Sequence, residues 1–152
     1  MPTLTTRYFN RLEYSGDAPF QFAAGIPGFE DHTAFLFVQQ PHTNPLIFMQ
    51  SLHDPAVCFI GLPATAVAPD YRLELSPEEA LALGLSQAEA PPGDLLSLVL
   101  LTFAENSEPV ANLMSPVVLN PRTHRGIQAI QLDSNYSLRH PLALESQAAT
   151  CS

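Results

Sequence analysis

Fifteen prolines divide this 152-residue chain into short stretches, and their spacing restricts the fold more than any other feature of the sequence. Proline has no backbone N–H to donate, and its ring clashes with the preceding turn of an α-helix. In the central part of the chain, short apolar runs are separated by prolines at positions 41, 45, 55, 63 and 69. These intervals are too short for helices of ordinary length but fit β-strands. We therefore expect a fold built mainly from short strands.

Several apolar runs have the composition of such strands. Tyr71–Leu75 alternates between apolar and charged residues, which is the period of a half-buried strand. The other runs are more continuously apolar, as is typical of strands that are buried on both faces. These runs are residues 34–38, 46–49, 57–60, 95–101, 116–119 and 127–132. We expect each of them to form a strand.

One helix is well marked at both ends. Ser76 has the residue type of an N-cap, Pro77 suits the first helical position, and Glu79 is placed to complete a capping box. The helix then continues through small and aliphatic residues to Gly84, which suits the left-handed position that closes a helix. This pattern predicts a helix of about two turns.

The length and the order of these elements indicate a single domain over residues 1–142, followed by a flexible C-terminal tail over 143–152. Residues 87–94 contain Pro-Pro-Gly and two acids, and they are predicted to form an exposed loop. So many strands in so short a chain indicate an all-β fold. We expect a small antiparallel β-barrel or sandwich-like domain with one or two short helices.

The charge balance is strongly acidic. Fifteen Asp and Glu residues stand against six Arg and no Lys, which gives a formal net charge of −9. Such a surface repels phosphate groups, so the composition argues against direct binding to nucleic acid and against docking on anionic lipid. Neither a secretory signal nor an apolar stretch of membrane-spanning length is visible. We expect a cytoplasmic monomer in which Cys58 and Cys151 are free thiols.

Catalytic signatures are sparse. The five histidines are scattered and lack the spacing of a helical metal site, so no metal or cofactor is expected. One alternative is a hydrolase that uses His53 with a nearby acid such as Asp54. Another is a barrel that binds a small molecule, with Gln50 as a polar anchor. The phenylalanines expected to line the interior of that barrel are Phe35, Phe37, Phe48 and Phe59.

Five motifs combine polar and apolar residues in a fixed order along the chain. They are Gly25–Glu30 (Gly-Ile-Pro-Gly-Phe-Glu), Met49–Ser51 (Met-Gln-Ser), Pro69–Tyr71 (Pro-Asp-Tyr), Ala111–Asn120 and Gly126–Tyr136. Together they resemble the motifs of the flagellar assembly factor FliW family, over about residues 3–142. The chain departs from that family at Val110, where threonine is usual, and at Ser115, where alanine is usual. Lysines that many relatives carry are replaced by Arg122, His124 and Arg125.

The resemblance implies protein binding without chemistry. Members of the family bind the RNA-binding translational repressor CsrA away from its RNA pocket and prevent it from silencing flagellin mRNA. They also bind flagellin, so the secretion of flagellin frees the factor to act on the repressor. The acidic composition agrees with the first partner, because RNA-binding proteins are basic. The expected partners are therefore a CsrA-type regulator and flagellin.

Residue roles follow from position. Glu105 and Glu108 flank the Ala111–Asn120 motif and are the predicted acidic part of an interface. Asn112 is suited equally to a turn and to a polar contact beside Met114, and Gln50 is a further candidate contact. Phe29 is interpreted as a core residue, with an exposed aromatic anchor as the alternative. The residues predicted to shape turns are Pro27, Gly28, Pro116 and Asn120.

Overall fold

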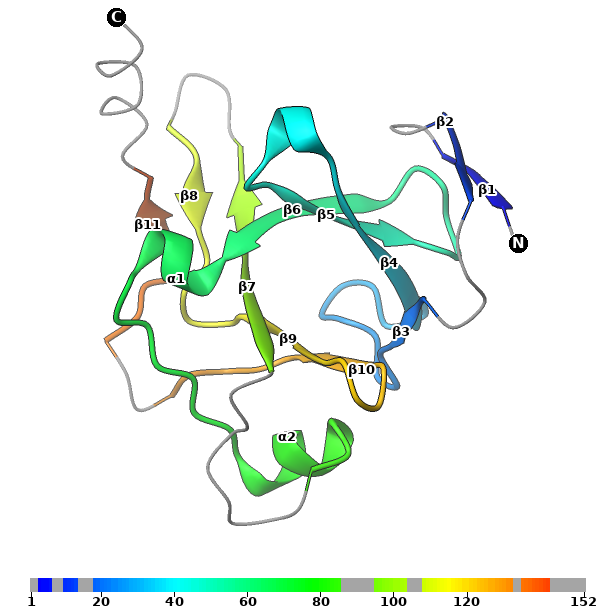
Figure 1. The fold of residues 1–152 in the computed structure, drawn as a ribbon. Helices are drawn as coiled ribbons and strands as arrows, with labels where there is room; N and C mark the ends of the chain where they lie inside the picture. Colours follow the sequence, from blue (N-terminus) through cyan, green and yellow to red (C-terminus); the bar gives the residue numbers. More distant parts are fainter. Residues whose placement is uncertain are drawn as a thin grey trace, which may run out of the picture.

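In this computed structural model, seven strands close into a barrel (Figure 1). The structure describes residues 3–6, 10–13, 18–85, 95–103, 108–132 and 135–142. Around the ring, the strand order is β7-β6-β5-β4-β3-β10-β9, and a pairing of β9 with β7 closes it. The strands are β3 (Phe20–Gln21), β4 (Ala34–Gln39), β5 (Ile47–Ser51), β6 (Cys58–Pro63), β7 (Leu96–Thr102), β9 (Val117–Asn120) and β10 (Arg125–Gln128).

The barrel is mixed rather than purely antiparallel. Neighbouring strands run antiparallel around the ring, except that β3 and β10 pair in parallel through Gln21 and Arg125. A closed ring with an odd number of strands cannot alternate direction throughout, so one parallel pair is a geometric necessity. The predicted small β-barrel is confirmed, and its single parallel pair makes it a mixed barrel.

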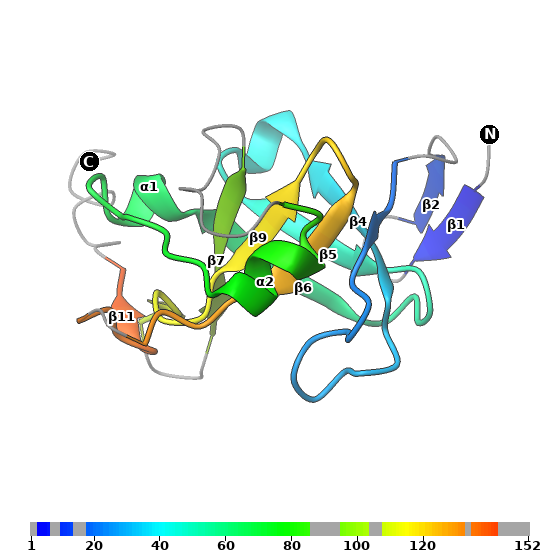
Figure 2. The same cartoon turned by 90° about the horizontal axis from the view of Figure 1, so that it is seen from below.

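Short elements lie outside the ring. A separate hairpin of β1 (Thr3–Thr6) and β2 (Asn10–Glu13) precedes the barrel. Strands β8 (Val110–Ala111) and β11 (His140–Pro141) extend the sheet beyond β7. The helical elements are η1 (Pro41–Thr43), α1 (Ala64–Val67) and α2 (Pro77–Ala82), and Figure 2 shows α2 lying against the β9–β10 side of the barrel.

Most of the predicted strands are present. The runs at 34–38, 46–49, 57–60, 95–101 and 116–119 correspond to β4, β5, β6, β7 and β9. The run at 127–132 is correct only at its start, because β10 ends at Gln128. The short strands β1, β2, β3, β8 and β11 were not expected, since two to four residues are too few to show a clear period. The predicted loop at 87–94 and the tail at 143–152 lie outside the described residues.

The Tyr71–Leu75 segment is not a strand, which corrects the prediction made from its alternation. Its side chains do alternate between half-buried and exposed, as the sequence indicated. Its backbone, however, bonds to side chains instead of to a neighbouring strand. The N–H of Arg72 donates to the hydroxyl of Tyr136 at 2.9 Å, and the N–H of Glu74 donates to Oε1 of Gln131 at 2.8 Å. The alternation in this segment therefore predicted correctly which side chains are buried, but it did not predict which groups form hydrogen bonds with the backbone.

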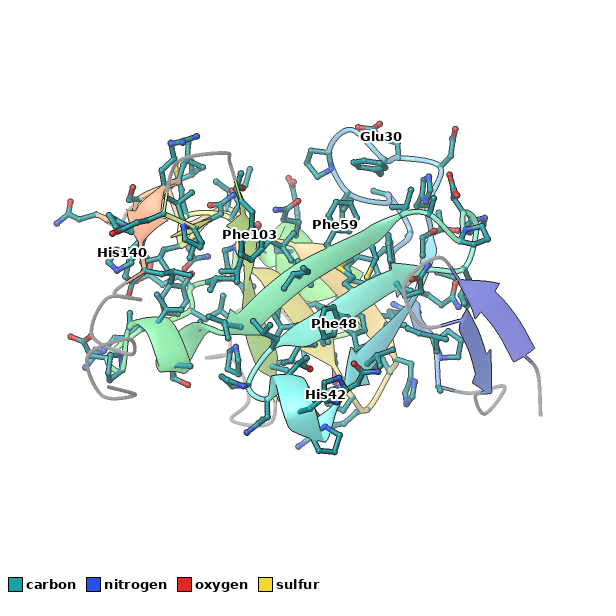
Figure 3. The ribbon with its side chains drawn as sticks, turned by 90° about the horizontal axis from the view of Figure 1, so that it is seen from above. Glu30, His42, Phe48, Phe59, Phe103 and His140 are labelled. Carbon is teal, nitrogen blue, oxygen red and sulfur yellow. The ribbon has the colours of Figure 1, made fainter. Side chains whose placement is uncertain are left out.

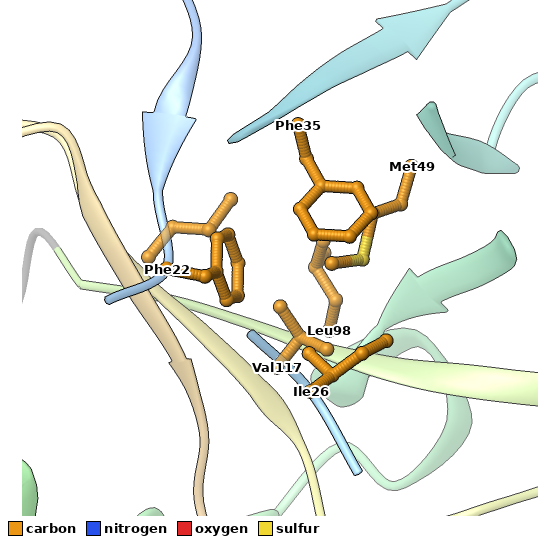
Figure 4. Close-up of a cluster of buried hydrophobic side chains, with 7 residues drawn as sticks. Phe22, Ile26, Phe35, Met49, Leu98 and Val117 are labelled. Atoms are coloured by element: carbon orange, nitrogen blue, oxygen red, sulfur yellow. The ribbon is translucent and has the colours of Figure 1, made fainter. Parts of the chain in front are cut away.

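The interior of the barrel is filled by apolar side chains (Figure 4). Phe22 and Phe35 meet edge to face, with ring centroids 5.2 Å apart, and both are fully buried. The other buried members of this cluster are Ile26, Met49, Leu98, Val117 and Leu119. Burial of large apolar side chains on this scale is the main stabilising term for a domain of this size.

The centre of β7 and the whole of β9 are buried on both faces, which explains their continuously apolar sequences. On β7, Leu98 faces the barrel interior, whereas Val99 packs outward against a second cluster that includes Ala64 of α1 and Leu142. On β9, Val118 packs outward against a third cluster that contains Leu83, just after α2. The short helices are thus covers for the outer faces of these two strands.

The helix α2 begins and ends as the sequence predicted. Ser76 and Glu79 form a complete capping box, and Gly84 closes the helix with φ of 80°. The carbonyl of Leu83 accepts hydrogen bonds from Nδ2 of Asn120 at 2.8 Å and from Oγ1 of Thr123 at 2.9 Å. The β9–β10 turn therefore fastens the C-terminal end of α2 to the barrel.

Cys58 is a free thiol on β6. It is half-buried, and burial raises the pKa of its thiol to about 11. The thiol is therefore protonated at neutral pH and is a poor nucleophile. Cys151 lies outside the described residues.

Candidate functional site

The loop that joins β3 to β4, residues 22–33, lies across one end of the barrel (Figure 1). It contains the Gly-Ile-Pro-Gly-Phe-Glu motif. Pro27 and Gly28 occupy the centre of a tight turn that is closed by a 2.8 Å hydrogen bond from the N–H of Phe29 to the carbonyl of Ile26. Gly28 has φ of 86°, as a type II turn requires at this position. The turn directs Ile26 into the barrel interior, where it is buried.

Gly25 is required by close packing within this loop. Its φ is 64°, and a Cβ atom at this position would lie 2.5 Å from the carbonyl oxygen of Phe29. No side chain fits there, because real Cβ atoms do not approach backbone that closely. The first glycine of the motif therefore allows the loop to fold back on itself.

Phe29 combines properties of the two roles considered from the sequence, a core residue and an exposed aromatic anchor. Its ring is half-buried and packs edge to face against Phe59 of β6, with centroids 5.1 Å apart. A second edge contact joins it to His32 at 5.4 Å. Figure 3 shows Phe59 beneath this loop and Glu30 at its tip. Phe29 thus anchors the loop on the barrel and leaves part of its ring accessible.

Glu30 is held at the tip of the loop by its own backbone. The N–H of Gly28 donates to Oε2 of Glu30 at 3.0 Å. This hydrogen bond, together with one from the N–H of Glu30 itself, lowers the pKa of the Glu30 carboxyl below its usual range. The carboxylate is therefore charged throughout the physiological pH range and fixed in orientation.

Gln50 does not present its side chain to a partner in this structure. It is fully buried, and its Nε2 donates to carbonyls of the loop after β5, at 3.0 Å for Ser51, 3.2 Å for Val57 and 3.3 Å for Pro55. It also does not anchor a ligand inside the barrel. The alternation of β5 places Met49 in the interior cluster and Gln50 on the opposite face. Gln50 shapes the 51–57 loop.

Phe48 was predicted to line the interior of a ligand-binding barrel, but it lies outside the interior. Phe48 lies two residues from Gln50 on β5 and therefore on the same outer face of that strand. Figure 3 shows Phe48 on the outside of the barrel. Phe35 is buried in the interior cluster, and Phe37 and Phe59 pack against it. These three rings pack together with aliphatic side chains such as Ile26 and Met49 in the interior cluster.

A serine–histidine pair is present, but its geometry is structural. Nδ1 of His32 lies 2.7 Å from Oγ of Ser51. The same Oγ accepts hydrogen bonds from the N–H groups of His53 and Asp54, and Ser51 is fully buried. A buried oxygen that is saturated in this way cannot attack a substrate. The exposed His53 contacts Thr33 at 3.2 Å, so these residues join the 51–57 loop to loop 22–33.

The Ala111–Asn120 motif forms a second structured loop, residues 112–116, between β8 and β9. Oδ1 of Asn112 accepts a hydrogen bond from the N–H of Ser115 at 2.9 Å, which is the geometry of a turn residue. Met114 is half-buried and Pro116 is buried. At the far end of the motif, Oδ1 of Asn120 accepts from the N–H of Arg122 at 3.1 Å. Asn120 thus organises the turn after β9 in addition to holding α2.

Two tyrosines brace this loop from the side. The hydroxyl of Tyr71 donates to the carbonyl of Leu113 at 2.7 Å. The ring of Tyr71 stacks on that of Tyr136, with centroids 4.4 Å apart. Burial, followed by the proximity of Tyr136, raises the pKa of the Tyr71 hydroxyl above its usual range, so the donor keeps its proton. The ends of the Pro69–Tyr71 and Gly126–Tyr136 motifs therefore meet at the 112–116 loop.

The predicted acidic pair is only partly described. Glu108 is exposed just before β8, and Glu105 lies outside the described residues. At the two altered positions, Val110 pairs within the sheet and the backbone N–H of Ser115 is engaged by Asn112. The predicted contacts thus fall into two groups, with Phe29 and Gln50 beside one end of the barrel and Glu108, Asn112 and Met114 around β8.

Gln131 has a structural role that its sequence position did not predict. It is buried, and it forms a pair of hydrogen bonds with the backbone of Glu74, accepting at 2.8 Å and donating at 2.7 Å. Its own N–H donates to the carbonyl of Met114 at 2.7 Å. Gln131 lies in an apolar run, and a polar residue there was the one available signal.

Two cavities of about 410 Å³ each open on the barrel. The first lies between loop 22–33, α2 and β10. The second is apolar and lies where β4, β6 and β7 reach the opposite end, lined by residues such as Ile47, Pro63 and Leu96. Among the described side chains, no three His, Cys, Asp or Glu residues gather as metal ligands. The helices in the described part of the chain have three to six residues and are too short to cross a membrane.

The fold and these loops define a class: a small, filled, mixed β-barrel with two short helices outside it and loops that are fixed by side-chain hydrogen bonds. The model of the FliW protein family matches residues 3–142. The flagellar assembly factor FliW of Syntrophomonas wolfei is 32% identical over 146 residues, covering 95% of this chain and 91% of that protein. The FliW of Carboxydothermus hydrogenoformans is 33% identical over 137 residues, covering 90% and 86%.

The three-dimensional comparison agrees. A crystal structure of the flagellar assembly factor FliW superimposes with a TM-score of 0.81 at 28% identity, covering 92% of this chain and 96% of that one. The chain belongs to the FliW family of flagellar assembly factors.

Proposed function

We propose that this flagellar assembly factor is a non-enzymatic, cytoplasmic protein-binding antagonist of a CsrA-type translational regulator, and that it also binds flagellin. By holding the regulator, it relieves the repression of flagellin mRNA translation. The observation that carries the proposal is family membership over residues 3–142, which includes all five motifs. Binding of flagellin by the same protein would couple this relief to the export of flagellin.

The charge of the chain supports the first partner. The net charge is −9 without a single lysine. An RNA-binding regulator carries a basic surface, and opposite charges speed the encounter and set the orientation of the two proteins. The same charge repels RNA itself. The proposed antagonist therefore binds the regulator and does not bind the mRNA.

The 112–116 loop and the acids before it are the proposed contact for the regulator. Tyr71 and Gln131 hold the loop by hydrogen bonds to its carbonyls at 2.7 Å each. A braced loop loses little conformational entropy on binding, which favours affinity. Glu108 is exposed on the other side of the short strand β8, and Met114 is half-buried within the loop. The proposed contact thus combines an accessible charge with a partly accessible apolar side chain.

Recovery of partners from the native cell tests the function itself. The full-length tagged chain, purified from a flagellated culture in low salt, is expected to bring down the CsrA-type regulator and flagellin, identified by mass spectrometry. Recovery of neither protein would contradict the proposal. Recovery of a small molecule alone would favour the ligand-binding alternative instead.

Reversal of the two acids before β8 tests the contact. The double variant Glu105→Lys, Glu108→Lys is expected to bind the regulator about tenfold more weakly, with a smaller dependence of affinity on salt, because attractive charge pairs become repulsive. Titration calorimetry at two salt concentrations measures both effects. Thermal stability is expected to stay nearly unchanged.

A charge-matched control is available on the 70–75 segment. Asp70 and Glu74 are exposed, and the variant Asp70→Lys, Glu74→Lys changes the net charge by the same amount. It is expected to retain most of the affinity. Equal losses in the two double variants would show that only the overall charge matters and would remove the site assignment.

A further inference from the structure

The cavity between loop 22–33, α2 and β10 has an apolar floor with acids around it. The apolar lining comes from three separate elements and includes Ala23, Ile26 and Pro27 of the loop, Ala82 of α2 and Ile127 of β10. Glu30, Glu78 and Glu79 also line it. No arginine or histidine is among the lining residues, so the carboxylates have no cation of this cavity to neutralise them. We refer to this cavity as the loop–helix groove.

Two of the three carboxylates are fixed in place. Glu79 accepts hydrogen bonds from the N–H groups of Ser76 and Ile130, at 2.9 Å each. Glu30 accepts from the N–H of Gly28 at 3.0 Å, which also keeps it ionised. Glu78 is exposed in the first turn of α2. Fixed negative charges beside an apolar floor favour an occupant that has both a positive charge and an apolar part.

A hydrogen bond from a residue of the groove lining connects the groove to the 112–116 loop, which is part of the proposed contact for the regulator. Gln128 lines the groove, and its Nε2 donates to the carbonyl of Ser115 in the 112–116 loop at 3.0 Å. A partner seated on that loop therefore has the groove within reach. A volume of about 410 Å³ accommodates one long side chain and part of its neighbour.

We infer that the loop–helix groove receives an arginine or lysine side chain, with an adjacent apolar residue, from the CsrA-type regulator. The aliphatic stem packs on the apolar floor, and the cationic head lies among Glu30, Glu78 and Glu79. An anionic occupant is repelled by the same three carboxylates. A neutral apolar occupant displaces water from the carboxylates and offers them no hydrogen bond or opposite charge in return, which is unfavourable. This inference rests on the proposed function, since it names where the regulator is held.

The groove is tested by filling it without changing the charge. The variant Ala82→Phe adds a ring to an exposed helix position that lines the groove, and it is expected to lower the affinity for purified regulator about tenfold or more in calorimetric titration. The matched control is Ala66→Phe on α1, an exposed alanine outside the groove lining. Its affinity is expected to stay within about twofold of the unmodified protein. Thermal melts of both variants check folding.

The charge of the occupant is tested separately. The variant Glu30→Gln, Glu78→Gln removes two charges and keeps an acceptor oxygen for the N–H of Gly28. It is expected to weaken binding about fivefold and to reduce the salt dependence, because fewer ionic contacts are screened. Unchanged affinity in this variant, with a loss in Ala82→Phe, would show an uncharged occupant and overturn the inference.

The remaining outcomes separate the inference from the function on which it rests. Binding of the regulator to the unmodified protein with equal affinity for Ala82→Phe would overturn the inference alone. The same result accompanied by a loss of flagellin binding would also overturn it and would assign the groove to flagellin. No binding of the regulator to the unmodified protein would overturn both the inference and that part of the proposed function.

Discussion

Replacement of Gly126 by alanine is expected to lower the free energy of unfolding by about 3 kcal/mol, since overpacking a filled core displaces side chains from their preferred rotamers. Gly126 lies on β10, where the ring of Phe22 crosses directly over its backbone. A Cβ atom there would lie 2.4 Å from Cζ of Phe22 and 2.9 Å from Cδ2 of Leu119. Both neighbours are buried in the barrel interior, so moving either of them disturbs its contacts with the rest of the cluster. Urea unfolding followed by circular dichroism measures the loss.

Gly28→Ala is the control for the Gly126 variant. Gly28 has φ of 86°, but an added Cβ would meet no atom within 4 Å. Its replacement is therefore expected to cost only about 1 kcal/mol, from the left-handed backbone conformation. If the Gly126 variant lost no more stability than the Gly28 variant, the close approach of Phe22 would not limit the packing of the barrel.

Replacement of Gln131 by methionine is expected to cost about 2 to 3 kcal/mol, because two hydrogen bonds disappear and leave backbone groups without partners. Methionine has nearly the same length and shape, so packing changes little. The groups left unpaired are the N–H and the carbonyl of Glu74, now bonded to Gln131 at 2.8 and 2.7 Å. The midpoint of urea unfolding is expected to fall while the slope of the transition stays the same.

Gln128→Met provides the comparison for Gln131. Gln128 is half-buried and gives one side-chain hydrogen bond, to the carbonyl of Ser115 at 3.0 Å. Its loss is expected to cost about 1 kcal/mol. Equal effects for the two variants would mean that the 71–75 segment is held by packing of its apolar side chains rather than by Gln131.

Local features of the sequence were reliable where short-range chemistry decides the structure. The capping box at Ser76 and Glu79 formed as predicted, because both partners lie within one turn of each other. Pro27 and Gly28 lie at the centre of a tight turn for a similar reason. The family motifs could also be identified from the sequence, since each of them is contiguous in the chain.

Features that depend on contacts with residues far away in the sequence could not be predicted. Gln50 had the sequence position of an exposed anchor or an interior one, but the loop that folds back over β5 buries it. The 71–75 segment had the period of a strand, yet its partners are side chains 57 and 64 residues away. The loop–helix groove combines residues from 23 to 128, and no window of sequence brings them together.

From the amino-acid sequence alone it follows that this chain is strongly acidic, forms a β-rich domain with one well-capped helix, and carries the motifs of the FliW family. Those properties depend on composition, on turn and cap residues, and on the alternation of neighbouring side chains. Three further features are visible only in the folded chain: the closure of the ring between β7 and β9, the identity of the buried polar residues, and the position of the acidic groove. These depend on contacts between segments far apart in the chain, and local periodicity reports whether a side chain is buried but not which residue it meets.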